Sequence, residues 1–217
     1  MIVYYENLPE HRVMRILIVF LLFVLCGCTT EPKKPAISGS VIRISEISPD
    51  KWTALARQNL EQLIQIYHLD PILFTRDINI QSNIETHSHP ILSLNTRYAE
   101  YPNKLLSVFV HEQLHWWVDH KKQNVDKAIH EMKKIFPVLP KDSTYLHLII
   151  CFLEYDAMIH YLKLKEANKI LKDFIYKDKI NSWINTQVYL KFKTINFIIK
   201  RNKLSPIPKH FKALTKR

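Results

Sequence analysis

The sequence predicts an α+β fold, with a small β-sheet in the N-terminal half and a mainly helical C-terminal half. Segments in which apolar and polar side chains alternate occur before residue 100, and apolar side chains three or four residues apart dominate after residue 102. The 217 residues, of which 47% are hydrophobic, suffice for one domain with a sizeable core or for two small ones.

In the N-terminal half, a helix is expected first and short strands after it. The triplet Ser-Pro-Asp at 48–50 is typical of a helix start, and an apolar face follows it, so a helix is predicted over roughly 50–68. The Asp-Pro pair at 70–71 ends this helix. Segment 72–81 alternates enough to form one or two short strands, and segment 90–98 to form another.

In the C-terminal half, the apolar spacing predicts helices throughout. Pro102 is suited to the first turn of a helix. The predicted helices cover approximately residues 103–120, 124–136, 144–170, 168–177 and 181–202.

The N-terminal segment "MRILIVFLLFVLCGC" has the features of an export signal. A positive Arg15 precedes ten apolar residues, a run too short to span a bilayer. The run ends in Leu-Cys-Gly-Cys at 25–28, which resembles the lipobox of bacterial lipoproteins. That resemblance implies a signal peptide over 1–27, with Met14 as an alternative start, and a diacylglycerol-linked Cys28 that anchors the chain in a lipid membrane.

The remaining chain then divides by composition. Residues 28–40 form the lipidated cysteine and a flexible tether, 41–204 the folded domain, and 205–217 a basic tail. Thr29 is not aspartate, and by the sorting pattern of lipoproteins this favours the outer membrane, facing the periplasm or the cell surface.

Positive charge is concentrated in the C-terminal half. Residues 29–120 carry 8 basic and 10 acidic side chains, and residues 121–217 carry 21 and 8, within a net charge of +11. Two explanations of this positive charge stay open: lysine-rich helix faces that are solvated, or a surface that docks an anionic partner. No nucleic-acid-binding module accompanies it, so no specific nucleic-acid partner is expected.

The sharpest motif is His-Glu-Gln-Leu-His at 111–115, which matches H-E-x-x-H inside a predicted helix. His111 and His115 are one helical turn apart, so their imidazoles point the same way and can share one metal ion. Glu112 is rotated toward the position of a water on that metal, from which it can accept a proton.

This segment resembles the active-site helix of the zincin superfamily of metallopeptidases, and the resemblance extends over roughly residues 41–165. It implies a zincin-like fold, Zn²⁺ as cofactor, His111 and His115 as zinc ligands, and Glu112 as the general base. It also implies a peptide or protein substrate that lies along an edge strand before the motif helix, where 90–98 is placed.

The third zinc ligand differs among zincins. Val118 and Lys121 stand where metzincins carry glycine and histidine, so that subfamily is excluded. The gluzincin arrangement takes a glutamate from a later helix, and Glu154 lies inside an apolar helical run where a buried carboxylate needs a partner. His147 is one rival, and Asp156, about 200° around the helix from Glu154, is another.

Several further polar residues are candidates for supporting roles. Asp119 is expected as a hydrogen-bond partner of a ligand histidine and is also a rival ligand. His147, Tyr155 or Tyr161 could stabilise the oxyanion of a transition state, and each could equally be a core residue. His87 and His89 fit an ordinary turn better than a second metal site, and Cys151 is expected as a small buried hydrophobe.

The sequence leaves two functions open. The first is a membrane-anchored zinc hydrolase, namely a peptidase that uses Glu112 to activate water. The second is a non-catalytic binding or assembly lipoprotein with a zincin fold, which docks an anionic partner through its basic half. The intact Glu112 favours the first, because a binding site has no need of a base there.

Overall fold

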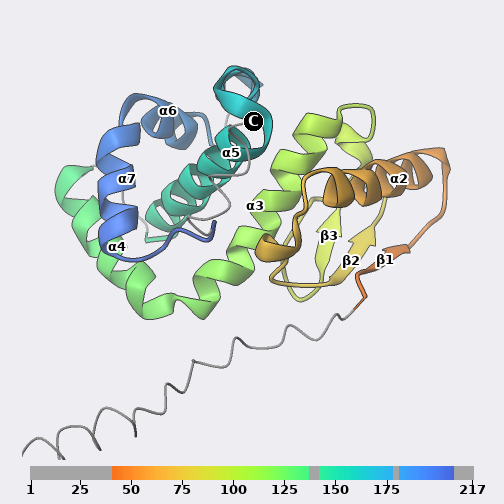
Figure 1. Ribbon diagram of the computed structural model, residues 1–217, viewed down its shortest axis with the longest axis horizontal. Coiled ribbons are helices and arrows are strands. Elements are labelled where there is room, and N and C mark those ends of the chain that lie inside the picture. Colours follow the sequence, from red (N-terminus) through yellow and green to blue (C-terminus); the bar gives the residue numbers. More distant parts are fainter. Residues whose placement is uncertain (1–40, 137–141, 178–180, 208–217) are drawn as a thin grey trace, which may run out of the picture. The chain divides into compact units, whose positions relative to one another are not determined.

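The computed structural model describes residues 41–136, 142–177 and 181–207 (Figure 1). The chain divides into units 1–40 and 41–217, and the second contains all the described residues. The signal peptide, Cys28, the tether and most of the predicted tail therefore lie outside the described part. The elements are β1 (Arg43–Glu46), α2 (Lys51–Ile66), η1 (Asp70–Ile72), β2 (Asp77–Ile80), β3 (Leu92–Leu94), η2 (Thr96–Tyr98), α3 (Pro102–His120), α4 (Lys122–Ile135), α5 (Asp142–Lys177), α6 (Ser182–Leu190) and α7 (Phe192–Arg201).

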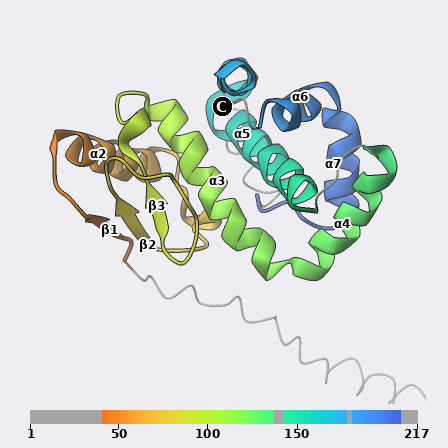
Figure 2. The same ribbon diagram turned by 180° about the vertical axis from the view of Figure 1, so that it is seen from behind.

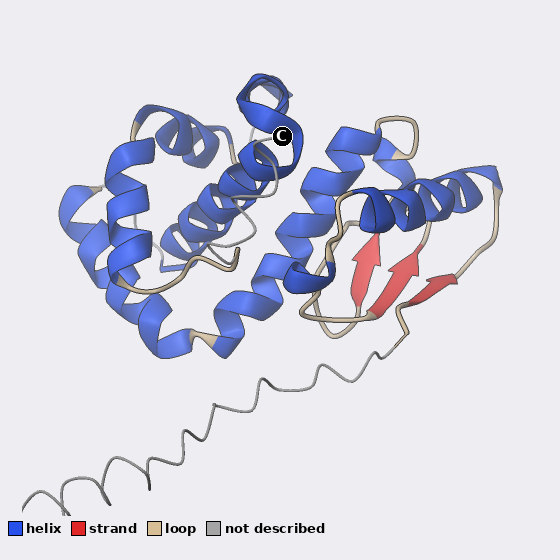
Figure 3. Cartoon of the chain, in the orientation of Figure 1, coloured by secondary structure: helices blue, strands red, loops and turns tan. Residues whose placement is uncertain are grey.

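The predicted α+β class is confirmed: a small sheet precedes a mainly helical half (Figure 3). The sheet has the order β1-β2-β3, and both pairs of strands are parallel. Strand β2 presents Ile78 and Ile80 to the core, and β3 presents Leu92 and Leu94, all four of them almost completely buried. Burial of these β-branched and leucine side chains is what holds the short strands together.

Two details of the sheet differ from the sequence prediction. Strand β1 was not expected, because its residues are exposed or half-buried and it lies at the edge. The predictions of strand over 72–81 and 90–98 are correct only for 77–80 and 92–94. Residues 70–72 form a 3₁₀ turn instead, in which the Leu73 N–H donates to the Asp70 carbonyl, because the Asp-Pro pair favours a turn at this point.

Helix α2 starts one residue later than the predicted start. Asp50 is its N-cap, and one carboxylate oxygen accepts from the Trp52 and Thr53 N–H groups at 2.7 and 2.8 Å. The Thr53 hydroxyl accepts from the Asp50 N–H in return, which completes a capping box. This helix forms the connection between the parallel strands β1 and β2.

Helix α3 lies between the sheet and the other helices of the C-terminal half, as both opposite views show (Figure 2). It runs over the predicted range and buries Leu105, Leu106, Phe109 and Val110. Gln113, fully buried, accepts from the Phe74 and Thr75 N–H groups and donates to the Thr75 carbonyl. The motif helix is thereby fixed to the loop that leads into β2.

The helices after α3 follow the prediction with two exceptions. Helix α5 continues from 142 to 177 but is broken at Lys163, whose backbone has φ 68° and ψ 161°. The predicted single helix over 181–202 is wrong, because Lys191 separates α6 from α7. Among the described residues, no helix combines the length and the apolar character needed to cross a membrane.

Candidate metal centre

The motif helix and α5 face each other through two polar rows. The spacing of three or four residues puts each row on one side of its helix. Ser107 contacts Glu154 at one end and the His115 ring contacts the His147 ring at the other, so the two helices run antiparallel. The rows are Ser107, His111 and His115 on α3 and Glu154, Cys151 and His147 on α5.

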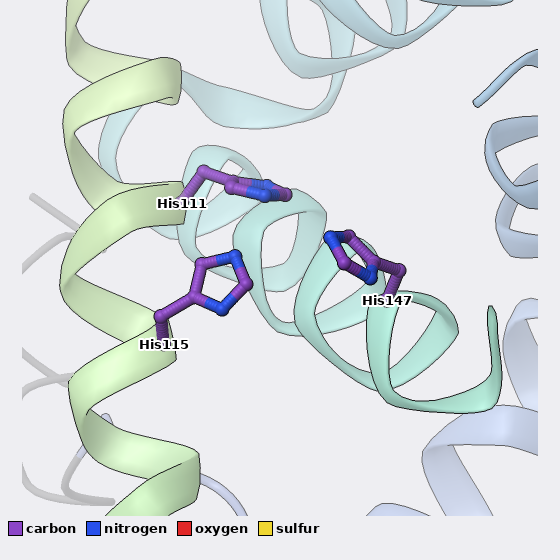
Figure 4. A group of neighbouring side chains, drawn as sticks. All are labelled: His111, His115 and His147. Carbon is purple, nitrogen blue, oxygen red and sulfur yellow. The ribbon is translucent and has the colours of Figure 1, made fainter. Parts of the chain in front are cut away.

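Three imidazoles meet at one end of these rows (Figure 4). The ring centroids are 5.2 Å apart for His111 and His115, 5.3 Å for His115 and His147, and 6.2 Å for His111 and His147. Each ring offers a nitrogen that lies within 4.8 Å of the other two, and all three residues are half-buried. The three histidines could therefore hold one metal ion.

Hydrogen bonds fix the tautomers of two of these rings. The Nδ1 of His147 lies 3.0 Å from the Ser143 carbonyl oxygen, which can only accept, so Nδ1 carries the proton. The Nδ1 of His111 lies 2.8 Å from Oε2 of Glu154. In each ring Nε2 is therefore the nitrogen that can face a metal ion. Metal-binding histidines usually donate a hydrogen bond from the other nitrogen to a carboxylate or carbonyl oxygen.

Glu154 is not brought together with both motif histidines. It is buried, with 7% of its surface exposed, and its Oε1 accepts from the Ser107 hydroxyl at 2.5 Å. Among the described residues, the groups whose ligand atoms lie within 4.8 Å of one another are His111 with His115 and His147, and His111 with Cys151 and Glu154. The expected set of His111, His115 and Glu154 is not one of them. Glu154 on α5 lies opposite Ser107 and His111, and His147 lies opposite His115.

The electrostatic environment differs between the two motif histidines. Burial, together with repulsion from positive charge on His111, His147 and His89, lowers the pKa of His115 to about 3. His115 therefore stays neutral, as a metal ligand must. Burial also lowers the pKa of His111, but its hydrogen bonds with Cys151 and Glu154 outweigh burial and raise this pKa well above the usual range, so a metal ion at Nε2 would have to displace a proton.

Glu112 is the only acidic residue of the motif, and it is buried with 8% of its surface exposed. Burial raises its pKa, nearby Glu154 raises it further, and His111 and His87 lower it. A raised pKa makes a carboxylate a stronger proton acceptor, which suits a general base. Glu112 and His111 line one cleft, and their action on one site stays a prediction.

A cleft of about 730 Å³ opens beside these residues. Segment 84–86 and residues 95–98 line one side of it, and α3, α5 and the start of α6 line the rest. Its lining includes His111, Glu112, Cys151 and Glu154. Such a volume is in the range of small-molecule and peptide-binding sites.

The other candidate residues lie apart from this cleft. Asp119 pairs with His89, with 3.1 Å between Oδ2 and Nε2, instead of with a motif histidine. The Tyr155 hydroxyl donates to Asn168 at 2.5 Å. Tyr161, whose pKa burial raises to about 12, packs edge-on against Tyr67. Neither tyrosine is among the residues that line the cleft.

The free edge of β3 is occupied by the chain itself. The Ser93 N–H donates to the His87 carbonyl at 2.8 Å, and the His87 N–H donates to the Ser93 carbonyl at 3.0 Å, in an antiparallel bridge. The expectation that segment 90–98 offers a free edge to a substrate is therefore wrong at Ser93, where His87 occupies that edge. His89 belongs to a turn, where its ring stacks on Trp116 at 4.2 Å between centroids.

Comparisons with family models, with curated proteins and with solved structures found no match. The chemistry of the site is therefore inferred from the side chains of this chain. Ser107 is a supporting residue that sequence reasoning missed. The available signal was its position four residues before His111, a hydroxyl within an otherwise apolar row.

Proposed function

We propose that the protein is a zinc-dependent hydrolase of peptide bonds, with His111, His115 and His147 as the zinc ligands. The observation that carries the proposal is the convergence of three imidazoles beside a buried Glu112. Three histidines leave one zinc position open for water or substrate, which is the coordination of catalytic sites. His147 takes the place that the sequence suggested for Glu154.

Glu154 has a supporting role in this proposal. Its carboxylate holds the Nδ1 proton of His111 at 2.8 Å, while the Ser107 hydroxyl holds the carboxylate. The pair keeps the His111 ring in one orientation and makes its Nε2 a better electron donor. A buried carboxylate on α5 is explained in this way without direct contact to the metal.

Zinc bound by the three rings would polarise the substrate carbonyl and acidify water. Glu112 would accept a proton from the attacking water and pass it to the leaving amine, as expected for a general base with a raised pKa. Residues 84–86 line the same cleft as Glu112, so a peptide bound in the cleft would contact them.

Membrane attachment remains part of the proposal. The lipobox-like segment ends at Cys28, and only the tether separates it from strand β1 at Arg43. An acylated Cys28 would therefore attach the folded domain to a membrane. Metabolic labelling with a fatty acid should mark the wild type and not Cys28→Ser. Equal labelling of both would contradict the lipidation of Cys28.

The test of the catalytic assignment is the zinc-loaded full chain incubated with a mixed peptide library. The wild type should cleave peptides, and Glu112→Gln should keep one zinc per chain but lose activity by roughly 10²–10⁴-fold. Gln113→Glu, which alters the neighbouring motif position, is unsuitable as a control because Gln113 is buried. Glu100→Gln is suited, because Glu100 is exposed and is not among the residues that line the cleft. A Glu112→Gln variant as active as wild type would remove Glu112 from the mechanism.

A further inference from the structure

A second set of metal-binding atoms shares His111 with the first. One ligand atom each from His111, Cys151 and Glu154 lies within 4.8 Å of the other two. Cys151 and Glu154 are both buried, with 5% and 7% of their surface exposed, and both stand on α5 facing the same imidazole. The proposed mechanism uses Glu154 only as a partner of His111 and does not use Cys151.

The donor types of this set differ from those of the three histidines. A thiolate and a carboxylate together carry two negative charges, which balance a divalent cation in a buried place, whereas three imidazoles carry none. Sulfur is a soft donor and favours soft cations such as Cd²⁺ over Mg²⁺ or Ca²⁺. The second set is therefore suited to a thiophilic divalent cation, and binding would release the thiol proton to solvent.

The two sets cannot both be filled while His111 is neutral. A neutral imidazole has one lone pair, and in the zinc-binding arrangement it lies on Nε2 because Nδ1 donates to Glu154. A cation between Cys151 and Glu154 would take the Nδ1 lone pair and leave the ring proton on Nε2. His111 would then be lost to the set formed with His115 and His147.

A cation has a way in from solvent. Cys151, Glu154 and His111 all line the cleft of about 730 Å³. Behind them, Ser107, Cys151 and Glu154 border a cavity of about 10 Å³, which is close to the space of one water molecule. The cation would therefore reach the thiol through the same opening as the substrate.

We propose that Cys151, Glu154 and His111 form an inhibitory site for a thiophilic divalent cation, which competes with the zinc held by the three histidines. Binding at this site is independent of the proposed hydrolase function, and only its inhibitory effect rests on that function. The shared His111 is the point of competition.

The experiment titrates Cd²⁺ into the full chain in detergent micelles after loading with one equivalent of zinc. Three quantities are followed: the ultraviolet thiolate-to-cadmium absorption, the zinc released, and peptide hydrolysis relative to each variant's own cadmium-free rate. Cys151→Ser and Cys151→Ala remove the sulfur with little change in size, and circular dichroism checks their folding. Cys26→Ser and Cys28→Ser, made in every chain tested, remove the two other cysteines of the full chain.

In the chain that retains Cys151, the absorption should saturate at one cadmium, with zinc release and loss of hydrolysis in parallel. Both Cys151 variants should lack the absorption and keep hydrolysis at the same cadmium concentrations. Absence of the absorption from the chain that retains Cys151 would overturn the site. Equal zinc release from all chains would overturn the competition. Absorption without any cadmium-free hydrolysis would support the site and count against the hydrolase function instead.

Discussion

Replacement of Glu154 by glutamine separates its proposed supporting role from a role as zinc ligand. The carboxylate is buried and accepts hydrogen bonds from Ser107 at 2.5 Å and from His111 at 2.8 Å. Glutamine has nearly the same shape, and its carbonyl can still accept from His111. What is lost is the negative charge of the acceptor.

The size of the effect follows from that difference. A hydrogen bond to a charged group contributes about 1.5–3 kcal/mol and a neutral one about 0.5–1.5 kcal/mol. The change should therefore cost about 1–1.5 kcal/mol of zinc-binding free energy, which corresponds to roughly a tenfold weaker affinity. Glu154→Leu, which leaves the His111 N–H buried without an acceptor, should weaken zinc binding more, by up to about 100-fold.

Competition with a chromophoric chelator measures the zinc affinity of the folded full chain. Asp156→Asn makes the same chemical change two residues further along α5, and it should leave the affinity unchanged. Complete loss of zinc from folded Glu154→Gln would show that Glu154 is a ligand, as the sequence first suggested. An affinity equal to that of wild type would show that it does not orient His111.

Three further predictions concern stability, each measured by chemical denaturation of the metal-free protein. Gln113→Leu should lower the free energy of unfolding by about 1–3 kcal/mol, because it leaves the Phe74 and Thr75 N–H groups without their acceptor; a neutral result would mean that water replaces the amide. Lys163→Gly should raise the free energy of unfolding by about 1 kcal/mol, because φ 68° and ψ 161° are strained for any residue with a Cβ. Lys163→Ala keeps a Cβ and should not raise it. Equal effects of the two substitutions would argue against strain. Asp173→Asn should lower the free energy of unfolding by up to about 1 kcal/mol at neutral pH, since hydrogen bonds from Lys104 and Lys177 hold the pKa of Asp173 below its usual value. This contribution is present above the unfolded-state pKa of 3.8 and is lost as pH falls through the lower folded-state value, so the two proteins should converge in acid; a difference that persists there would point to packing instead.

The helices were predictable because local sequence determines them. Pro102 and the apolar spacing placed α3 within one residue, and Asp50 marked the start of α2 through its side-chain capping. Strand β1 was missed because its side chains are mostly exposed, so its pairing with β2 leaves little trace in the pattern. The breaks at Lys163 and Lys191 carry neither glycine nor proline, and tertiary packing decides them.

The motif itself nominated His111, Glu112 and His115 as candidate site residues, because their relation depends only on helical periodicity. The partner of these residues on α5 depends on how two helices pack, and one sequence does not contain that information. His147 and Glu154 are seven residues apart and share a helix face, so the sequence could nominate both. The antiparallel alignment of the helices decides that His147 meets His115 while Glu154 meets Ser107.

The most direct test of the metal centre is the zinc content of folded His147→Ala after equilibrium dialysis, beside that of His120→Ala. The control is matched, because His120 also lies on a helix with Nδ1 against the carbonyl four residues earlier, at 2.6 Å compared with 3.0 Å for His147. We expect one zinc per chain in wild type and His120→Ala and none in His147→Ala at the same free zinc concentration. Full zinc retention by folded His147→Ala would contradict the three-histidine site.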